Sequence, residues 1–386
     1  MIKKFAILFP QFHEVSVNNI SWGYGFTDWA LVATANAFKF WNTRRAPLCG
    51  FYNLSNLKDV KNQFDTAIKS GLDGFGIYHY WFEDGGELQA VEKYLANSAL
   101  TNSDSTYFKY FFIWANESWS RRWAGEDTNV IKKISASPSD HEIQEHVKYL
   151  APFIKSKEYF KVNDRPILAI YRPEVFSNYL DVINKYRSEF KKYDVDILLG
   201  YFIKSNSDSI YSNNFDFCYL FEPRLFFNYM RFGNKKLIFR FYKNLTKLLP
   251  YGVVEFISKY SIFLFSKKNT SYSYRKFISY LKSNVRDKFV RDLKCSTQNV
   301  ISAGWNNSPR YRSNYTELEV PAVQEFCEAL SYSSDLNIYS NDYPLLCNAW
   351  NEWSEGAAIE PCAYLGDSLL RSFVNKNFPD SKKDAS

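Results

Sequence analysis

Ile167-Leu168-Ala169-Ile170 is an apolar run with no polar residue inside it, and Phe108 to Ile113 is a second strongly apolar run. Strands of this composition are typical of parallel sheets, because both faces of such a sheet are covered and neither set of alternating side chains meets water. Six further runs bring the number to eight, and together they lie near residues 5–9, 72–78, 108–114, 166–171, 196–202, 215–221, 299–304 and 344–350.

Longer amphipathic stretches separate most of these runs, as expected for helices. They lie near residues 56–70, 87–98, 139–154, 175–192, 320–332 and 367–375. Eight strands that alternate with helices predict an α/β fold that closes into a (β/α)8 TIM barrel, rather than an open doubly wound sheet. The link between the fifth and sixth runs is the least regular part of this pattern.

The length and composition fit one large domain. The chain has 386 residues, of which 46% are apolar and 23% charged, so a sizeable core is available and global disorder is excluded. We predict a single catalytic domain over residues 1–376 and a polar tail over 377–386. Aromatic residues make up 19% of the chain. Such rings pack cores and also stack on the apolar faces of sugars, and both interpretations stay open.

The six cysteines form no C-x-x-C pair, and Cys218 and Cys347 fall inside apolar runs, which predicts reduced core residues. The apolar run after Met1 is too short for a signal peptide, and no stretch of eighteen apolar residues exists. We therefore expect a cytoplasmic protein. The four histidines lack metal-ligand spacing, so we predict no metal and no cofactor; His141 and His146 fall on a predicted outer helix and are expected to be solvated.

Residues 224–294 carry 17 Lys and Arg against three acidic residues, a net charge of about +14 in a chain whose total is +7. We predict a basic, mainly helical insertion over 224–298, after the sixth strand. A basic amphipathic helix can lie on an anionic membrane face, which would place the protein at the inner membrane. The alternative is a solvated helical layer packed on the barrel. A nucleic acid partner is not predicted, because no binding motif accompanies the charge.

The clusters richest in Trp, Asn, Glu and Arg follow directly after apolar runs. In a barrel these junctions line one face, where active sites lie. Polar groups can hydrogen-bond sugar hydroxyls while aromatic rings cover the sugar face, so we predict a saccharide site. The predicted substrate-binding residues are His13, Trp22, Asp28, Trp29, His79, Tyr80, Trp81, Asn116, Glu117, Arg121, Arg122, Trp305, Trp350, Asn351, Trp353 and Glu360.

Glu352 and Glu355 are the predicted catalytic pair, because two carboxyl groups can do the acid and base work of glycosidic cleavage. Three residues apart on one helical turn, their Cβ atoms would lie about 5–6 Å apart. That separation is compatible with the roughly 5–5.5 Å between the carboxyl groups of retaining glycosidases. A loop would place them otherwise, so the spacing permits this mechanism without proving it.

Several of these residues also have a simpler structural interpretation. Glu117 could pair with Arg121 or Arg122 instead of substrate. Asp28 could cap a helix that begins at Trp29. By the same reasoning, His13 and His79 could be hydrogen-bonded groups behind the site, and Glu360 could order the last loop.

The motifs together resemble the WbsX-type family of bacterial polysaccharide biosynthesis proteins, itself similar to glycoside hydrolase family 99. The motifs that carry the resemblance are Phe9-Pro10-Gln11-Phe12-His13, Gly25-Phe26-Thr27-Asp28-Trp29, Gly74 through Trp81, Trp114-Ala115-Asn116-Glu117 with Arg121-Arg122-Trp123, Gly304 through Arg310, and Asn348 through Glu355 with Ile359-Glu360-Pro361. They span residues 5 to 361. This sequence departs from the family at Asp28, where Glu is commoner, and in the basic insertion.

The resemblance implies a TIM barrel and a role in assembling or trimming O-antigen or capsule. Family 99 enzymes are endo-acting α-mannosidases with a similar late Glu-x-x-Glu, in which one carboxylate deprotonates the sugar 2-hydroxyl and the other protonates the leaving oxygen. On that resemblance Glu352 is the base and Glu355 the acid. The WbsX-type name instead implies a glycosyltransferase, although the sequence has no Gly-rich dinucleotide fingerprint and no Asp-x-Asp motif.

We therefore expect an enzyme that acts on glycosidic bonds of a bacterial surface polysaccharide or its lipid-linked precursor. The barrel and paired glutamates favour a hydrolase or transglycosidase. The family resemblance and the basic insertion favour a transferase of O-antigen or lipopolysaccharide biosynthesis. A third interpretation is a non-catalytic carbohydrate-binding protein.

Overall fold

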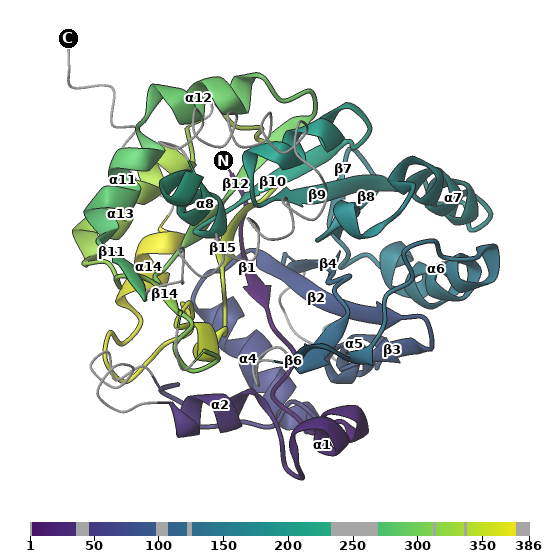
Figure 1. The fold of residues 1–386 in the computed structure, drawn as a ribbon, viewed down its shortest axis with the longest axis horizontal. Coiled ribbons are helices and arrows are strands. Elements are labelled where there is room, and N and C mark those ends of the chain that lie inside the picture. The colour runs from purple at the N-terminus through teal and green to yellow at the C-terminus, as the bar shows by residue number, and fades with distance from the viewer. Residues whose placement is uncertain are drawn as a thin grey trace, which may run out of the picture.

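Eight parallel strands form a closed barrel at the centre of the molecule (Figure 1). The structure is a computed structural model, and it describes residues 2–35, 46–97, 107–121, 126–232, 269–311, 314–335 and 338–375. The strands are β1 (Lys4–Leu8), β2 (Gly74–Phe82), β4 (Lys109–Trp114), β8 (Arg165–Ile170), β9 (Leu198–Ile203), β10 (Phe217–Phe221), β12 (Ser296–Ser302) and β15 (Leu345–Asn348). Each pairs with the next, and β1 pairs with both β2 and β15 to close the ring. The (β/α)8 prediction and its eight strands are confirmed.

The strands are buried on both faces, as their composition predicts. In β4 and in β8, five of the six residues are buried. Backbone spacing also constrains the sequence at Gly74, where a Cβ atom would lie 2.1 Å from the Lys109 carbonyl oxygen of the neighbouring strand. Any side chain there would push β2 and β4 apart, which explains glycine at this position.

Helices surround the barrel as an outer ring in Figure 1. The helices at or near the predicted positions are α4 (Leu57–Lys69), α5 (Ala90–Ala96), α6 (Asp140–Lys155), α7 (Tyr179–Lys191), α13 (Val323–Ser333) and α14 (Ser368–Val374). The start of α6 is fixed by a capping box, in which the Ser139 side chain accepts from the Glu142 N–H and the Glu142 carboxylate accepts from the Ser139 N–H. The predicted helices are thus confirmed to within a few residues.

Shorter elements decorate the loops between strands and helices. They are α1 (Ser16–Trp22), α2 (Asp28–Thr34), β3 (Gly85–Glu87), β5 (Trp119–Arg121), β6 (Glu126–Lys132), β7 (Lys161–Val162), η3 (Pro173–Val175), η4 (Asn206–Asn213), β13 (Trp305–Asn306), β14 (Thr316–Leu318) and η6 (Trp353–Glu355). The irregular link between the fifth and sixth strands contains the 3-10 helix η4 rather than an α-helix.

The predicted basic insertion is described at its two ends, 224–232 and 269–298. These ends form α8 (Arg224–Phe232), β11 (Thr270–Tyr272), α11 (Tyr274–Leu281) and α12 (Asn284–Arg291). The apolar residues of α8 face the protein, because Phe226 is fully buried against Phe277 and Tyr280 of α11. The described ends therefore form a helical layer packed on the barrel. Residues 233–268, which carry much of the predicted membrane-binding surface, lie outside the described part of the chain, as does the predicted tail 377–386.

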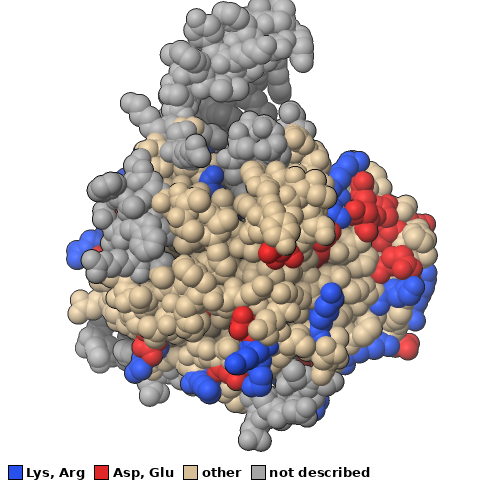
Figure 2. Space-filling model, turned by 90° about the horizontal axis from the view of Figure 1, so that it is seen from below, with Lys and Arg blue, Asp and Glu red and all other residues tan. Residues whose placement is uncertain are grey.

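On the face shown in Figure 2, basic and acidic side chains of the described residues lie close to one another instead of forming separate patches. None of the helices that the structure describes has the length and apolar character needed to cross a bilayer. The six cysteines are free thiols, and Cys218 and Cys347 are buried in β10 and β15 as predicted.

Candidate active site

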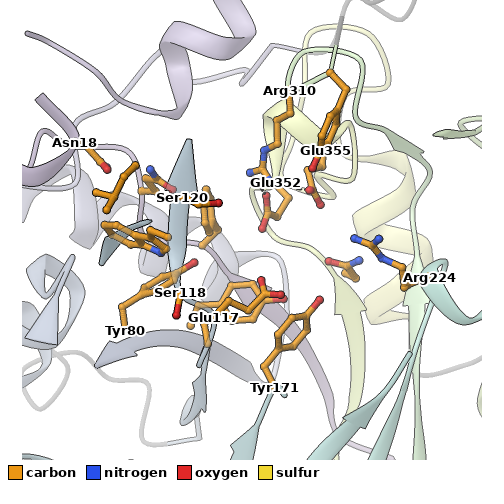
Figure 3. A pocket seen from close by; sticks show the side chains of 18 of the residues that line it. Asn18, Tyr80, Glu117, Ser118, Ser120, Tyr171, Arg224, Arg310, Glu352 and Glu355 are labelled. Atoms are coloured by element: carbon orange, nitrogen blue, oxygen red, sulfur yellow. Dashed lines mark hydrogen bonds and ion pairs between the residues drawn. The ribbon is translucent and has the colours of Figure 1, made fainter. Parts of the chain in front are cut away.

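A cavity of about 210 Å³ lies at the carboxyl ends of the barrel strands (Figure 3). Its walls come from segments far apart in the sequence, because each parallel strand delivers the residues that follow it to the same end of the barrel. The lining residues are Phe9, Gln11, Asn18, Trp22, Tyr78, Tyr80, Ala115, Glu117, Ser118, Trp119, Ser120, Ile131, Tyr171, Phe221, Arg224, Trp305, Arg310, Tyr311, Asn348, Glu352 and Glu355. The two predicted catalytic glutamates therefore face one cavity.

Arg310 joins these two glutamates. Its Nη1 donates to Glu355 Oε1 at 2.5 Å, and its Nη2 donates to Glu352 Oε2 at 2.9 Å. The same Nη2 lies 3.3 Å from Asp28 Oδ1, and Nε donates to the Ser354 hydroxyl at 2.7 Å. One planar guanidinium thus holds three carboxylates in a fixed arrangement, which a lysine ammonium cannot do.

The electrostatic environment favours proton sharing between the glutamates. Burial raises the pKa of Glu352 well above its ordinary value, and the negative charge of Glu355 adds to the increase while Arg310 opposes it. Burial also raises the pKa of Glu355, against the lowering effect of Arg310 and Arg224. Two nearby carboxyl groups that are both hard to ionise tend to keep one proton between them. A protonated and an ionised carboxyl group, one acid and one base, can therefore lie next to each other here.

Asp28 belongs to this cluster rather than to a helix cap. The helix α2 begins at Asp28 with Thr27 as its N-cap, and no side chain makes the capping hydrogen bond. The Asp28 carboxylate instead accepts from the Ser354 hydroxyl at 2.7 Å, besides its contact with Arg310. The helix-cap interpretation of Asp28 is wrong for this reason, and the residue acts as a buried support for Arg310 and the loop of the glutamates.

Four further predicted residues lie behind the glutamates and shape the loop that carries them. Trp350 and Trp353 are fully buried, and Trp350 Nε1 donates to Gln63 Oε1 at 2.6 Å. Asn351 binds the backbone of the loop that follows the first strand.

Glu360 accepts from Trp353 Nε1 and from the Tyr52 hydroxyl, both at 3.0 Å. Burial raises the pKa of Glu360 to about 7. Trp29 packs on the same side, 6.4 Å from Trp353 between ring centroids.

The opposite wall contains Tyr80, Trp22 and Glu117, all predicted and all lining the cavity. The Glu117 carboxylate accepts from Arg172 Nη1 at 2.7 Å, whereas its predicted partners Arg121 and Arg122 have side chains outside the described part of the chain. Asn116 lies beneath it, fully buried. Its Oδ1 accepts from the Arg172 N–H at 2.7 Å and its Nδ2 donates to the Arg172 carbonyl at 2.8 Å. Through these two hydrogen bonds, Asn116 joins the loop after β4 to the loop after β8.

Other predicted residues lie away from the cavity. His79 is buried between the barrel and the outer helices, where its Nδ1 lies 3.1 Å from Glu92 and its Nε2 lies 3.0 Å from His146 Nε2. Trp81 stacks on His146 at 4.9 Å between ring centroids. The prediction that His146 is solvated is wrong, because this side chain is fully buried on the inner face of α6. His13 is also buried outside the lining of the cavity.

Of the remaining predicted residues, Trp305 has a described side chain, whereas Arg121 and Arg122 do not. Trp305 lines the cavity from β13, as predicted for a residue after the seventh strand. The side chains of Arg121 and Arg122 lie outside the described part of the chain. Among the described residues, no group of three or more His, Cys, Asp or Glu side chains is arranged to hold a metal ion.

The predicted site residues omit several polar residues of the cavity, among them Arg310, Arg224 and Tyr171. Arg310 stands within the quoted Gly304 to Arg310 motif, and its position eight residues after Ser302, the end of the seventh strand, was the available signal. Arg224 was assigned to the basic insertion, although it follows β10 by three residues. Tyr171 directly follows β8, at the same barrel end. All three could have been found from their distance to a predicted strand end.

The comparisons with known proteins agree with this architecture. The family model described as Glycosyltransferase WbsX matches residues 4–373. The curated relatives include an uncharacterized protein, WxcX, from two strains of Xanthomonas campestris pv. campestris, 26% and 25% identical over 373 residues, which are 95% of this chain and 48% of each relative. The chain thus spans about half the length of the curated relatives it matches.

Solved structures show the same fold at low identity. A glycoside hydrolase-like protein superposes with a TM-score of 0.57 at 14% identity, covering 96% of this chain and 92% of that one. A GH99 endo-alpha-mannosidase from Bacteroides thetaiotaomicron, in complex with bis-tris-propane, superposes with a TM-score of 0.56 at 12% identity, covering 96% and 94%. The predicted resemblance is confirmed, and because the family model spans nearly the whole chain, this protein belongs to the glycosyltransferase WbsX family.

Proposed function

We propose that this protein is an enzyme that makes or breaks glycosidic bonds in a bacterial surface polysaccharide or its lipid-linked precursor, with Glu352 and Glu355 as its acid–base pair. The observation that carries the proposal is the arrangement of the two glutamates around Arg310 in a cavity at the carboxyl end of the barrel. Family membership and the likeness to glycoside hydrolase folds support the same class of chemistry.

A shared proton suits the neighbouring-group route that the resemblance to family 99 implies. Glu352 would take the proton of the sugar 2-hydroxyl, whose oxygen attacks the anomeric carbon while Glu355 gives its proton to the leaving oxygen. The first half thus closes a three-membered ring between the 2-oxygen and the anomeric carbon. In the second half, the acceptor hydroxyl gives its proton to Glu355 and attacks the anomeric carbon, which opens this ring. Glu352 then returns its proton to the 2-oxygen of the sugar. Arg310 would hold both carboxylates in position and stabilise whichever one is ionised.

The acceptor decides between hydrolysis and transfer. Water as the acceptor gives a hydrolase, whereas a sugar hydroxyl gives a transglycosidase. The WbsX family name favours a second candidate, a glycosyltransferase that uses an activated donor. The isolated host polysaccharide, incubated with the protein with and without nucleotide sugars, separates these functions by product size. Shortened chains without a donor indicate hydrolysis, and growth only with a donor indicates transfer.

Two variants test the catalytic pair itself. Glu355→Gln and Glu352→Gln are each expected to lose about 10²-fold or more in rate. Glu145→Gln on the exposed side of α6 is the matched control and should keep full activity. If Glu355→Gln leaves every measured activity unchanged, the protein is a binding protein or uses other residues.

The two roles can be separated by the leaving group. In an aryl glycoside made from an acidic phenol, the phenolate is a good leaving group and departs without protonation by a general acid. Glu355→Gln should therefore recover activity on such a substrate, while Glu352→Gln should not. The opposite pattern would exchange the two roles.

We also propose peripheral contact with an anionic membrane through the basic insertion. The support is its composition, 17 basic against three acidic residues over 224–294. The described ends of the insertion bury apolar residues such as Leu225, Phe226 and Phe277, so these side chains are not available to a membrane. Sedimentation with anionic vesicles at low and high salt tests this, and absence of binding at low salt rejects it.

A further inference from the structure

We propose that Arg224 binds an anionic group of the saccharide substrate, either the carboxylate of an acidic sugar or a phosphate of a sugar diphosphate. The inference names a substrate class for the proposed active site and rests on that function. Arg224 is the first residue of α8, and its side chain is exposed and extends into the cavity near Glu355 and Tyr171 (Figure 3).

The backbone of Arg224 is held firmly in this place. Glu222, two residues earlier, is fully buried, and its carboxylate accepts from the Phe226 N–H at 2.9 Å and from Arg286 Nη2 at 3.2 Å. The Glu222 carbonyl accepts from Asn348 Nδ2 at 3.2 Å, which ties the start of α8 to the end of β15. The position of Arg224 relative to the glutamates is therefore built into the barrel.

Arg224 differs from the other cations near the cavity. Arg310 contacts three carboxylates, and Arg172 pairs with Glu117 at 2.7 Å and with Glu174 at 3.0 Å. Lys204 donates to the Tyr171 carbonyl and pairs with Glu174. Within the described residues, Arg224 has neither a hydrogen bond nor an ion pair. A guanidinium offers five N–H donors, so this one is free to receive a ligand.

The nearby carboxylates do not already satisfy Arg224. Glu355 takes its close hydrogen bond from Arg310, and Glu117 takes its own from Arg172. Burial raises the pKa of both Glu352 and Glu355, and Arg310 already donates a hydrogen bond to each of these carboxyl groups. The positive charge of Arg224 is thus left facing the cavity.

The planar geometry of the Arg224 guanidinium favours ligands that carry two anionic oxygens on one atom. The planar fork of arginine matches two oxygens of a carboxylate or phosphate, and both form charge-assisted hydrogen bonds that neutral hydroxyls cannot equal. Carboxylates occur on uronic acids within a polymer, and phosphates occur where a sugar is joined to a lipid or nucleotide. The two sources share the pair of anionic oxygens that Arg224 would bind.

Binding measurements on the full chain test the proposal without relying on catalysis. The probes are glucuronic acid, inorganic pyrophosphate and, as the neutral comparison, glucose, followed by ligand-observed NMR. We expect at least one acidic probe to bind about 10-fold more tightly than glucose, because a hydrogen bond to a charged group adds about that factor. Preference for glucuronic acid identifies an acidic sugar, and preference for pyrophosphate identifies a diphosphate.

Variants separate Arg224 from other sources of affinity. Arg224→Gln should reduce binding of the acidic probe to the level of glucose, while Arg275→Gln, which removes an exposed arginine of α11 paired with Glu325, should not. The proposal is overturned if no acidic probe binds more tightly than glucose, or if Arg224→Gln keeps the preference. Glu355→Gln should still bind the probe, so loss of the proposed catalytic function and loss of anion binding are distinguishable.

Discussion

Asn351 uses both ends of its side-chain amide to bind the backbone of Phe9. Its Oδ1 accepts from the Phe9 N–H at 2.8 Å, and its Nδ2 donates to the Phe9 carbonyl at 3.0 Å. These bonds join the loop after the last strand to the loop after the first, across the point where the barrel closes. They also fix the residue that directly precedes Glu352.

Asn351→Ala should therefore damage both stability and activity. The substitution leaves the Phe9 N–H and carbonyl without partners inside the protein, at a cost of about 1–3 kcal/mol for each group. Urea unfolding measures this loss, and Asn184→Ala on the exposed side of α7 is the control. A variant as stable as the control would show that water or another group replaces the amide.

Arg310→Lys should reduce activity by about 10²-fold or more, because an ammonium cannot reach three carboxylates and a hydroxyl at once. Arg310 lowers the pKa of both glutamates, so weakening its contacts should move both limbs of the pH–rate profile to higher pH. The profile is the decisive measurement, because mere loss of structure would not shift it. Arg172→Lys, on the opposite wall, should leave both limbs in place.

The barrel could be predicted because its strands carry a strong signal. Most are short apolar runs, and burial on both faces leaves no alternation to confuse with a surface strand. The exception is β12, whose sequence STQNVIS has only Val300 and Ile301 as apolar residues. Small elements such as the β5–β6 hairpin were not predicted, since strands of three and seven mostly polar residues have no such run. The positions of Glu352 and Glu355 followed from the barrel, whereas their partner Arg310 lies 42 residues from Glu352 in sequence.

The alternation of side chains along a strand explains why some predicted site residues of β2 line the cavity and others do not. Side chains alternate across a strand, so Tyr78 and Tyr80 of β2 face the cavity while His79 and Trp81 face the outer helices. Treating the whole segment as one cluster overlooked this. His146 shows the corresponding lesson for a helix, because it lies three residues after Ile143 and four before Leu150, both buried.

Glu360 should make the free energy of unfolding fall as the pH rises towards neutral. Its pKa is about 7 in the folded protein against an ordinary value of 4.5, so its contribution to stability is complete below pH 4.5 and is lost as the pH rises through 7. Glu360→Gln removes this loss and keeps an acceptor for Tyr52 and Trp353. Relative to wild type, the variant should gain on the order of 3 kcal/mol between pH 4.5 and 8, as measured by urea unfolding. A constant difference between the two proteins across this range would contradict the assignment.

His146 should give the opposite dependence, on the acid side. It is buried against His79 Nε2 and the Tyr186 hydroxyl, at 3.0 and 2.7 Å, and burial followed by the charge of His79 lowers its pKa well below 6.5. The folded protein thus keeps His146 neutral, whereas the unfolded chain binds a proton near pH 6.5, so stability is complete above that pH and falls as the solution becomes more acidic. His146→Gln should unfold more easily at pH 7.5 but lose less stability on going to pH 5.5, by up to about 1.4 kcal/mol per pH unit. His141→Gln, at an exposed position of the same helix, should keep the slope of the wild type. Equal slopes for His146→Gln and wild type would mean that His146 accepts its proton in the folded state.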